Sequence, residues 1–549
     1  MGVPLDGSVL QMFLRQVDGM IFARNGAKLS GHFVIEPDHQ GNFPGTYPLL
    51  IEYIKINFLA DNDDALEQAC IDNMSSVKNG ADEMPWNEFG RFMVAYLRYL
   101  TLVDVKDLLS TYDLLTDLVQ KCTSALRHSV LGIVALPTVI KCSQALASFA
   151  MVLDKHPDLT RDLIRPSYDD EEGSESIPER CANIIRAAII ECFRERSGPS
   201  SDVDEDTPYG KRIGVYVLAN LCLKVLFQCD QLGAVPVVVD LIYEQAPPLH
   251  IYPKAHQITY LYYLGRFHFA TSHFYDAQAA LTTAFGLCPK SPYQLIDCRH
   301  QLRLILIYLI ASNIVLGRFP SPSLWQRPEI QDLRPRFEPL CTAIRKGDIT
   351  SFRRLTDVDN EHAPFFLRYR ILFQIKRASE IIIWRNLMRR TFLLVGQRGD
   401  TENRKAPTLD LDYVLQLMRW MERPMRYVDP DFADEYNPGY SFLDEGRDNY
   451  VERNSDDDFI LPNMLEVECM CAAMIHQGLL GGFVSHKLRR FAITGARSKG
   501  PLAAGFPRVW DVVRQREMET NPKGYVTGWK KGIPGEGERE IEVEEEAEY

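Results

Sequence analysis

The sequence predicts a mainly α-helical protein, a solenoid of helical repeats (TPR-like) capped by a C-terminal winged-helix subdomain. Three observations predict this fold class. Apolar residues recur at three- and four-residue spacing through most of the chain, one helical pair has the small residues of a tetratricopeptide hairpin, and residues 461–494 follow the order helix, strand, basic turn, strand. With 549 residues the chain exceeds what one hydrophobic core usually serves, so several packed units are expected.

Residues 1–208 are predicted to form helical hairpins. The first 30 residues or so predict two helices separated near Asn25-Gly26. Two acidic segments rich in Ser, Gly and Pro are expected to be surface loops, at Asp169–Ser176 and Ser197–Asp206, with a helix between them. Further helices are expected at Trp86–Val103, Val105–Ala125 and Leu131–Leu153.

Residues 209–378 are predicted to form TPR-like repeats. In the segment 260–290, Gly265 is followed by Ala277, Leu281, Ala284 and Pro289, at the intervals of the small and apolar positions of that 34-residue hairpin. The small residues Gly265 and Ala277 would let the two helices approach closely. Further along, Gly347-Asp348 predicts the turn between two short helices.

Residues 379–510 are predicted to form the winged helix. A long helix is expected from Ser379, and a second helix that Thr408 would cap. An acidic insertion at 427–459 then precedes the helix and hairpin of 461–494. The tail, residues 511–549, ends in a segment with 8 Glu and one Arg from Gly535 onward, and this end is expected to be disordered.

The net charge of −13 hides an uneven distribution of charge. Residues 366–426 contain 13 Lys/Arg against 6 Asp/Glu, and residues 460–531 contain 11 against 5, whereas the insertion at 427–459 contains 2 against 11. The carboxyl-terminal half is therefore basic, interrupted by one acidic segment. The net charge argues against a chain that coats nucleic acid over its whole surface, and the overall isoelectric point hides the local pattern.

Nothing in the sequence indicates an enzyme or a bound cofactor. The motifs of nucleotide, zinc-protease, calcium and serine-hydrolase sites are absent, and the twelve histidines are scattered. The twelve cysteines contain no C-x-x-C pair, which predicts buried free thiols in a reducing compartment. We expect an intracellular, soluble protein, because no uncharged apolar run reaches the length of a membrane helix.

Three blocks of the chain resemble a known family. They are LYYLGRFHFATSHFYDAQAALTTAFGLC, then RLILIYLIASNIVLGRFPSPSLW followed by FEPLCTAIRKGDITSF, and finally LEVECMCAAMIHQGLLGGFVSHKLRRFAIT. Helical repeats that lead into a winged helix are the PCI domain of the proteasome lid, the signalosome and an initiation-factor complex. Within that class the blocks resemble the PCI subunit of the nuclear-pore-associated transcription-and-export (second TREX) complex, the signalosome-subunit-twelve-like family.

This resemblance implies a non-catalytic scaffold subunit that couples transcription to mRNA export. It implies two protein partners, a larger PCI-like scaffold subunit and a small acidic subunit shared with the proteasome lid. It also implies binding of RNA or DNA by paired winged helices, no membrane contact, and a location in the nucleus at the nuclear pore. The alternative is a signalosome-like or proteasome-lid-like protein scaffold without nucleic-acid binding.

The candidate nucleic-acid-binding residues are basic side chains near the predicted hairpin. Five of them occur between residues 485 and 499 without an acidic residue, and a second group lies on the first helix of the winged helix. The alternatives are a solvated hairpin and, for the second group, ion pairs with the acidic insertion. The candidates are Lys487, Arg489, Arg490, Arg497, Lys499, Arg385, Arg389 and Arg390.

A candidate partner-binding edge lies on the first strand of the hairpin, at Phe483 and Val484. A partner could add a strand there, and the alternative is an edge covered by the chain itself. The tryptophans Trp384 and Trp420 are expected in the core rather than as platforms for stacked bases.

Overall fold

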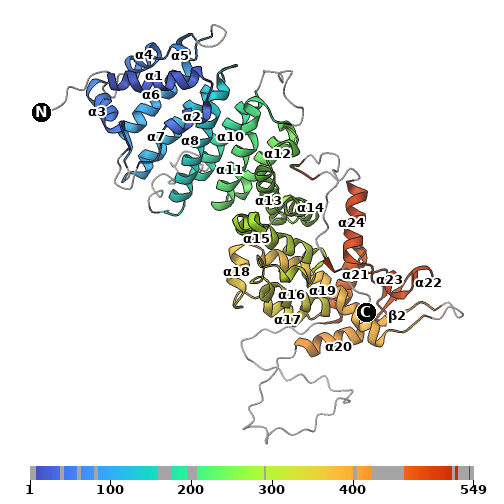
Figure 1. Cartoon of the computed structure of the whole chain (residues 1–549). Coiled ribbons are helices and arrows are strands. Elements are labelled where there is room, and N and C mark those ends of the chain that lie inside the picture. Colours follow the sequence, from blue (N-terminus) through green and yellow to red (C-terminus); the bar gives the residue numbers. More distant parts are fainter. Residues whose placement is uncertain are drawn as a thin grey trace, which may run out of the picture. The chain divides into compact units, whose positions relative to one another are not determined.

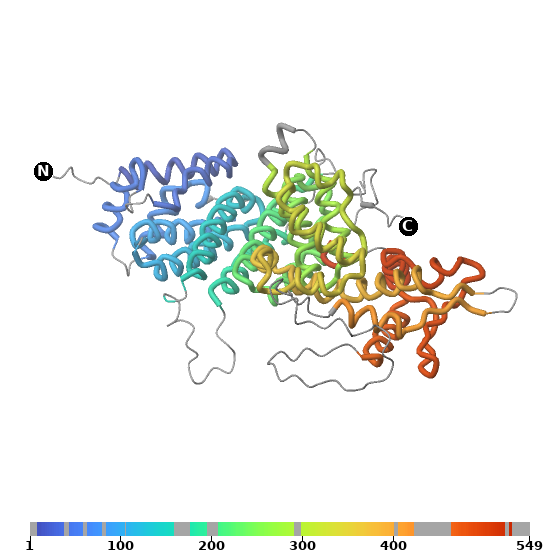
Figure 2. The backbone as a smooth tube through the Cα atoms, turned by 90° about the horizontal axis from the view of Figure 1, so that it is seen from below, coloured from blue at the N-terminus to red at the C-terminus, as the bar shows by residue number. Residues whose placement is uncertain are grey.

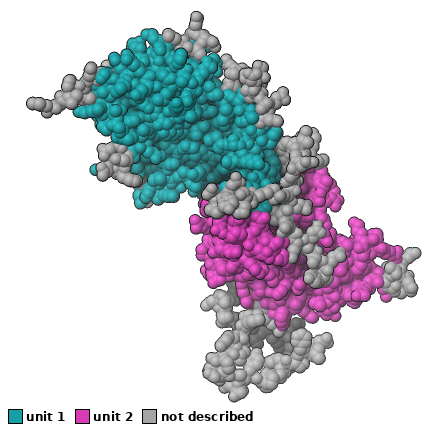
Figure 3. All heavy atoms as spheres, viewed as in Figure 1, with its two compact units in different colours: residues 1–271, 276–298, 525–539 teal, residues 272–275, 299–524, 540–549 magenta. Residues whose placement is uncertain are grey.

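The computed structural model describes two compact units. Unit 1 comprises residues 1–271, 276–298 and 525–539, and unit 2 comprises residues 272–275, 299–524 and 540–549 (Figure 3). The predicted boundaries after residues 208 and 378 lie within unit 1 and unit 2 respectively, and they stay predictions. The described residues are 8–37, 43–58, 63–79, 84–104, 106–156, 158, 176–194, 207–289, 292–399 (backbone only for 292–297), 405–422, 463–521, 526–529 and 543–544.

Unit 1 is a stack of α-helices in which neighbours along the chain are neighbours in space (Figures 1 and 2). Helix α6 packs on α7, α7 on α8, α8 on α10 and α10 on α11, as in a helical solenoid. This confirms the predicted helical-repeat class. The helices are α1 (Ser8–Phe22), α2 (Gly26–His32), α3 (Tyr47–Asn57), α4 (Asp63–Asn73), α5 (Ser75–Asn79), α6 (Asn87–Leu102), α7 (Leu108–Ala125), α8 (Gly132–Leu153), α10 (Ile177–Phe193), α11 (Val215–Gln228), α12 (Val235–Gln245), α13 (Lys254–Ala270) and α14 (Phe274–Leu287), with 3-10 helices η1 (Gly210–Gly214), η2 (Leu232–Ala234) and η3 (Leu249–Ile251).

Local sequence sets the starts of several of these helices. Asn25 caps α2 by accepting a hydrogen bond from the backbone N–H three residues on, which explains the break predicted near Asn25-Gly26. Asp107 caps α7 in the same way. At α10, Ser176 and Glu179 each accept a hydrogen bond from the other's backbone N–H, which is a complete capping box.

The predicted TPR-like hairpin is formed by α13 and α14. A Cβ atom added to Gly265 on α13 would lie 2.5 Å from Cγ of Leu281 on α14, so only glycine lets the helices approach this closely. Ala277 and Ala284 are fully buried. The structure therefore confirms the physical role predicted for these small residues.

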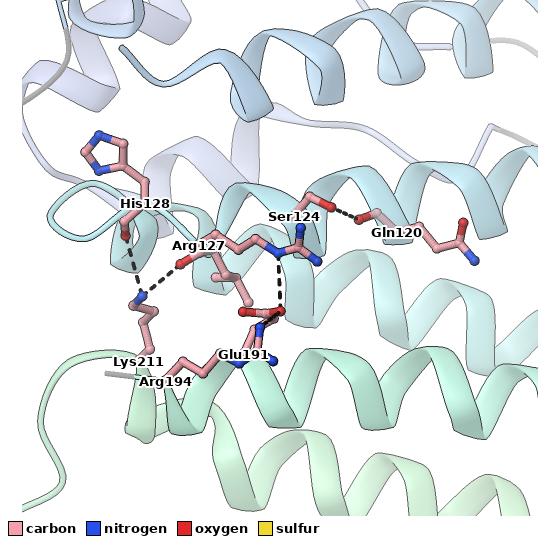
Figure 4. Close-up of polar contacts among 8 residues, drawn as sticks. Gln120, Ser124, Arg127, His128, Glu191, Arg194 and Lys211 are labelled. Carbon is pink, nitrogen blue, oxygen red and sulfur yellow. Dashed lines mark hydrogen bonds and ion pairs between the residues drawn. The ribbon is translucent and has the colours of Figure 1, made fainter. Parts of the chain in front are cut away.

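Basic side chains close the carboxyl end of α7. Lys211 of η1 is only 2% exposed, and its Nζ donates a hydrogen bond of 2.8 Å to the carbonyl oxygen of Leu126 and a longer one to the loop that follows (Figure 4). The last carbonyls of a helix have no partner within the helix, so this ammonium supplies one. Beside it, Glu191 of α10 accepts hydrogen bonds from Arg127 and Arg194 (Figure 4).

One described helix, α8, is long and apolar enough to cross a membrane by length and composition alone. Of its apolar window, 61% is buried inside the structure, against α2, α7, α10 and α11. Its Lys141 donates hydrogen bonds to the carbonyl oxygens of Ser30 and Phe33. These contacts are those of a core helix.

Unit 2 begins with helices that support the winged helix. The chain reverses at Gly347, as predicted, and its φ of +67° places this residue in the left-handed region. Asp348 then caps the next helix. A Cβ atom at Gly347 would lie 2.6 Å from the backbone nitrogen of Leu387, so this turn packs directly on the following long helix. The elements are α15 (Pro292–Val315, begun in unit 1), β1 (Phe319–Pro320, paired with β5, Val543–Glu544), η4 (Leu324–Gln326), α16 (Arg334–Lys346), α17 (Ile349–Leu355) and α18 (Ala363–Arg368).

The winged helix follows, with its three-stranded antiparallel sheet in the order β2-β4-β3. The predicted order of helix, strand, basic turn and strand is confirmed. The predicted capping role of Thr408 is wrong, because Thr408 begins a strand that pairs with Ala492, and the helix begins only at Leu411. The elements are α19 (Leu372–Val395), β2 (Thr408–Asp410), α20 (Leu411–Glu422), α21 (Met464–His476), β3 (Gly482–Ser485) and β4 (Arg490–Ile493).

Three further helices follow the sheet, and the last of them extends into the segment 511–549 that was predicted as the tail. They are α22 (Ala496–Lys499), α23 (Pro501–Gly505) and α24 (Val509–Thr520). In α24, Trp510 stacks on Tyr275 and receives the guanidinium of Arg318 over its ring, which explains why this segment is helical despite its weak periodicity. The insertion 427–459, most of the two loops predicted in unit 1, and the tail beyond 521 except 526–529 and 543–544 lie outside the described residues.

Candidate nucleic-acid and partner interface

The predicted basic hairpin has one buried and one exposed face. On the buried face, Val484, Phe491 and Leu409 occupy one row across β3, β4 and β2, and the last two are fully buried. On the other face, Phe483 is 56% exposed and Arg490 partly exposed. Because side chains alternate along a strand, this register decides which candidates meet solvent.

Arg490 and Arg489 are each paired with an acidic side chain of unit 2. Arg490 lies directly across from Asp410 on β2, and their Nε and Oδ2 atoms are 3.5 Å apart. Arg489, at φ +49°, lies 3.4 Å from a carboxylate oxygen of Asp412. Both pairs are partly exposed to solvent, so each reduces the positive charge of the hairpin and contributes little to stability.

Lys487 is the basic side chain in the hairpin turn for which the described residues show no ion pair. It is exposed, and no described acidic side chain lies within ion-pair distance of it. Its neighbour Leu488 is 62% exposed, and His486 is held 2.6 Å from a carboxylate oxygen of Glu468 on α21. The backbone oxygen of Arg489 accepts a hydrogen bond from the N–H of Leu411, which fixes the base of the turn to α20.

The two later candidates, Arg497 and Lys499, lie on α22 and are both exposed. Lys499 lines an open cavity of about 490 Å³ between the end of α21 and α24, together with Arg516, Glu519 and His476. The cavity mixes both signs of charge, and Arg516 uses one nitrogen to bind the carbonyl oxygen of Gln477. Lys499 is thus available to solvent at the rim of a polar recess.

The prediction for Arg385 is wrong. Arg385 is 1% exposed and holds three acceptors, the side-chain oxygen of Asn386 at 2.7 Å and the carbonyl oxygens of Phe506 and Pro507, both at 2.8 Å. Asn386 in turn donates to the carbonyl oxygen of Ile344 at the end of α16. Arg385 is therefore a structural guanidinium that joins three segments of unit 2, and it is inaccessible to a phosphate.

Arg389 and Arg390 lie one turn further along α19. Arg390 is exposed and Arg389 is half-buried, and neither forms an ion pair with a described acidic side chain. Whether they pair with the insertion 427–459 falls outside the described residues. They stay candidates for phosphate contact.

Helix α21 occupies the position of the recognition helix, yet it contains no lysine or arginine. Its charged side chains include Glu466 and Glu468, and Leu465 is 67% exposed. A helix that enters the major groove needs basic or amide side chains toward phosphates and bases. Nucleic-acid contact by this winged helix would therefore depend on the hairpin.

The predicted partner edge stays a prediction, and the structure shows where its two side chains lie. Strand β3 is an edge strand, and Phe483 is exposed, but Val484 belongs to the buried face, so only its backbone is offered to a partner. Trp384 is buried as predicted, whereas Trp420 on α20 is 66% exposed, against the prediction. An exposed tryptophan is a common anchor of protein interfaces. The apolar spacing of this helix did not indicate that Trp420 is exposed.

The described residues contain no group of three His, Cys, Asp or Glu side chains placed to hold a metal ion. Burial raises the pKa of the Cys471 thiol on α21 to about 12, which leaves it protonated and unreactive. The same cause raises the pKa of Cys341 to about 12. These thiols are packing residues.

Comparison with known proteins agrees with this architecture. No family model matches the chain. The chain is 25% identical over 74% of its length to a PCI domain-containing protein of Schizosaccharomyces pombe, of which it covers 80%. It is 24% identical over 77% of its length to PCI domain-containing protein 2 of Xenopus laevis, covering 86%, and 23% identical over 64% to the CSN12 homolog of Neurospora crassa, covering 69%. With the helical array and winged helix, these similarities support a PCI-domain protein.

Proposed function

We propose that this protein is a non-catalytic scaffold subunit of an mRNA-export complex at the nuclear pore, which binds RNA or DNA through its winged hairpin once joined to a PCI-like partner. The observation that carries the proposal is the hairpin itself. A rigid sheet presents Lys487 to solvent beside Arg489 and Arg490, whose carboxylate partners are partly exposed and exchangeable for phosphate. The names of the relatives support the PCI class, and the export role extends the sequence resemblance.

The test is binding of a fluorescein-labelled 20-nucleotide single-stranded RNA, followed by anisotropy from 25 to 200 mM salt, with the chain purified together with its co-eluting partner. We expect binding that weakens steeply with salt, because phosphate contacts release counterions. The variant Lys487→Glu/Arg489→Glu/Arg490→Glu should weaken binding by tenfold or more at low salt. The same measurements with duplex DNA distinguish the preferred nucleic acid.

A matched variant controls for net charge. Arg15→Glu/Lys28→Glu/Lys55→Glu makes the same change at three exposed positions of unit 1 and should leave binding nearly unchanged. Equal weakening by both variants would show a diffuse charge effect. No binding by the partnered chain at 25 mM salt would remove nucleic acid from the function.

The alternative function is a protein scaffold of the signalosome or proteasome-lid kind. The absence of lysine and arginine from α21, together with exposed Leu465 and Phe483, favours it. Affinity purification of the tagged chain, followed by mass spectrometry, separates the two. Recovery of a larger PCI-like subunit and a small acidic one with mRNA-export factors supports the first proposal, and recovery of signalosome or lid subunits supports the second.

A further inference from the structure

Residues 526–529 of the tail lie on a face of the TPR-like hairpin in unit 1. Two side chains of α13 bind consecutive backbone carbonyls there. The hydroxyl of Tyr260 donates a hydrogen bond of 2.7 Å to the oxygen of Gly528, and Nε2 of His268 lies 2.9 Å from the oxygen of Thr527. Both donors are buried, and they are eight residues apart, so they share one face of the helix.

The segment is a turn that fits this face through its backbone. The N–H of Trp529 donates to the oxygen of Val526, and Gly528 has a φ of +86°, as the third position of a type II turn requires. A Cβ atom at Gly528 would lie 2.3 Å from Val239 of α12 and 2.8 Å from Leu264 of α13. Only glycine can enter this space.

The turn contacts α13 through its backbone carbonyls more than through its side chains. Thr527 is exposed although its carbonyl is bound, while Val526 is 2% exposed. Burial raises the pKa of Tyr260 well above its usual value, so the hydroxyl stays a donor. Before this segment the chain forms α24 and after it β5, both in unit 2. The turn therefore enters unit 1 as a short separate segment.

We infer that the face of α13 around Tyr260, Leu264 and His268 is a peptide-binding site, which the turn Val526–Trp529 fills as a detachable intramolecular ligand. The site selects a turn with glycine at its third position and binds two carbonyls of that turn. A tethered ligand competes with a free peptide through its high effective concentration. Displacing the turn should therefore open the site to the same peptide added in solution.

The test uses the full chain carrying Gly528→Val and a fluorescein-labelled peptide of residues 521–532. The variant should bind the peptide at least tenfold more tightly than the unaltered chain does, and a peptide carrying the same valine should not bind. Gly45→Val is the matched control, because Gly45 is also in unit 1 with a positive φ but has no atom within 4 Å of an added Cβ. If the Gly528→Val chain folds but does not bind the peptide, the inference is wrong.

A second measurement avoids the glycine altogether. Tyr260→Phe removes only the hydroxyl, and it should raise the hydrogen-exchange rate of the Trp529 amide tenfold or more. Tyr263→Phe, on the same helix but stacked on Phe227, should leave that rate unchanged. An unaltered rate in Tyr260→Phe would show that the turn is a fixed part of the core.

Discussion

The hairpin β3–β4 in unit 2 and the end of α7 in unit 1 both gather basic side chains, but those side chains contact different groups. At α7, Lys211 is 2% exposed and binds backbone carbonyls. On the hairpin, Arg489 and Arg490 face partly exposed carboxylates, and Lys487 faces solvent. A buried ammonium that satisfies a helix end stabilises the fold, whereas an exposed guanidinium beside a carboxylate is available for exchange.

This difference shows that charge alone does not locate a binding surface. Arg385 belongs with Lys211, since it too holds carbonyl oxygens inside the protein, although its sequence context is that of the exposed Arg390. A basic side chain has a structural role when its acceptor is buried, and it is available for binding when its acceptor is exposed to solvent. The first three of the four predictions below test this distinction.

The largest effect is expected at Arg385. Arg385→Met should destabilise unit 2 by roughly 2–5 kcal/mol, because the buried carbonyls of Phe506 and Pro507 each lose a hydrogen bond. Urea unfolding with a probe in unit 2 measures the change. Arg389→Met, one turn further on the same helix, should stay within about 0.5 kcal/mol. Equal effects at both positions would erase the proposed distinction.

A smaller loss is expected at Lys211. Lys211→Met should lower the free energy of unfolding by about 1–3 kcal/mol, since the carbonyl of Leu126 is left buried without this donor. Thermal unfolding of the full chain reports it. Lys224→Met removes an exposed ammonium on α11 and serves as the comparison; it should leave the melting temperature almost unchanged.

On the hairpin, the carboxylates should matter for binding and hardly for stability. Asp410→Asn/Asp412→Asn frees both guanidinium groups and should change stability by at most about 1 kcal/mol per exposed pair. RNA binding by the partnered chain should tighten, with the salt slope steeper by roughly 0.7 for each new phosphate contact. A loss of stability with no gain in RNA binding would show that these arginines have a structural role, as Lys211 does.

The smallest effect concerns a half-buried imidazole. Burial lowers the pKa of His32 from 6.5, and no described group accepts or donates a hydrogen bond at its Nε2. The unfolded chain then takes up the proton more readily, so this contribution to stability is complete above pH 6.5 and is lost as the pH falls below it. His32→Phe should reduce the fall in melting temperature between pH 7.5 and 5.5, and His250→Phe, at an exposed position, should not.

Much of the fold could be predicted from local patterns. Apolar spacing located the hairpins of unit 1, Asn25-Gly26 marked the break between two helices, and Gly265 and Gly347 marked close packing and a turn. The helix break at Asn25 and the turn at Gly347 depend on residues within one or two turns of chain. Such signals can be recognised in the sequence because the interactions that cause them are local.

Strand β2 and helix α24 could not be found in the same way. Three residues of strand carry no periodic signal, and Thr408–Asp410 is stabilised by its pairing with β4, about 80 residues further on. Helix α24 depends on the contacts of Trp510 with Tyr275 and Arg318. Both elements form because distant segments meet, which spacing does not encode.

The sequence by itself determined the helical class, the basic hairpin and the glycines where backbones approach. Only the tertiary structure decided which cations meet solvent. Helix α19 is buried all round between Ile382 and Met388. A four-residue spacing puts Arg385 and Arg389 on one face of the helix. That spacing could not show that α16 and the segment after α23 enclose Arg385. Exposure is a property of the neighbours that a helix acquires, and those neighbours come from elsewhere in the chain.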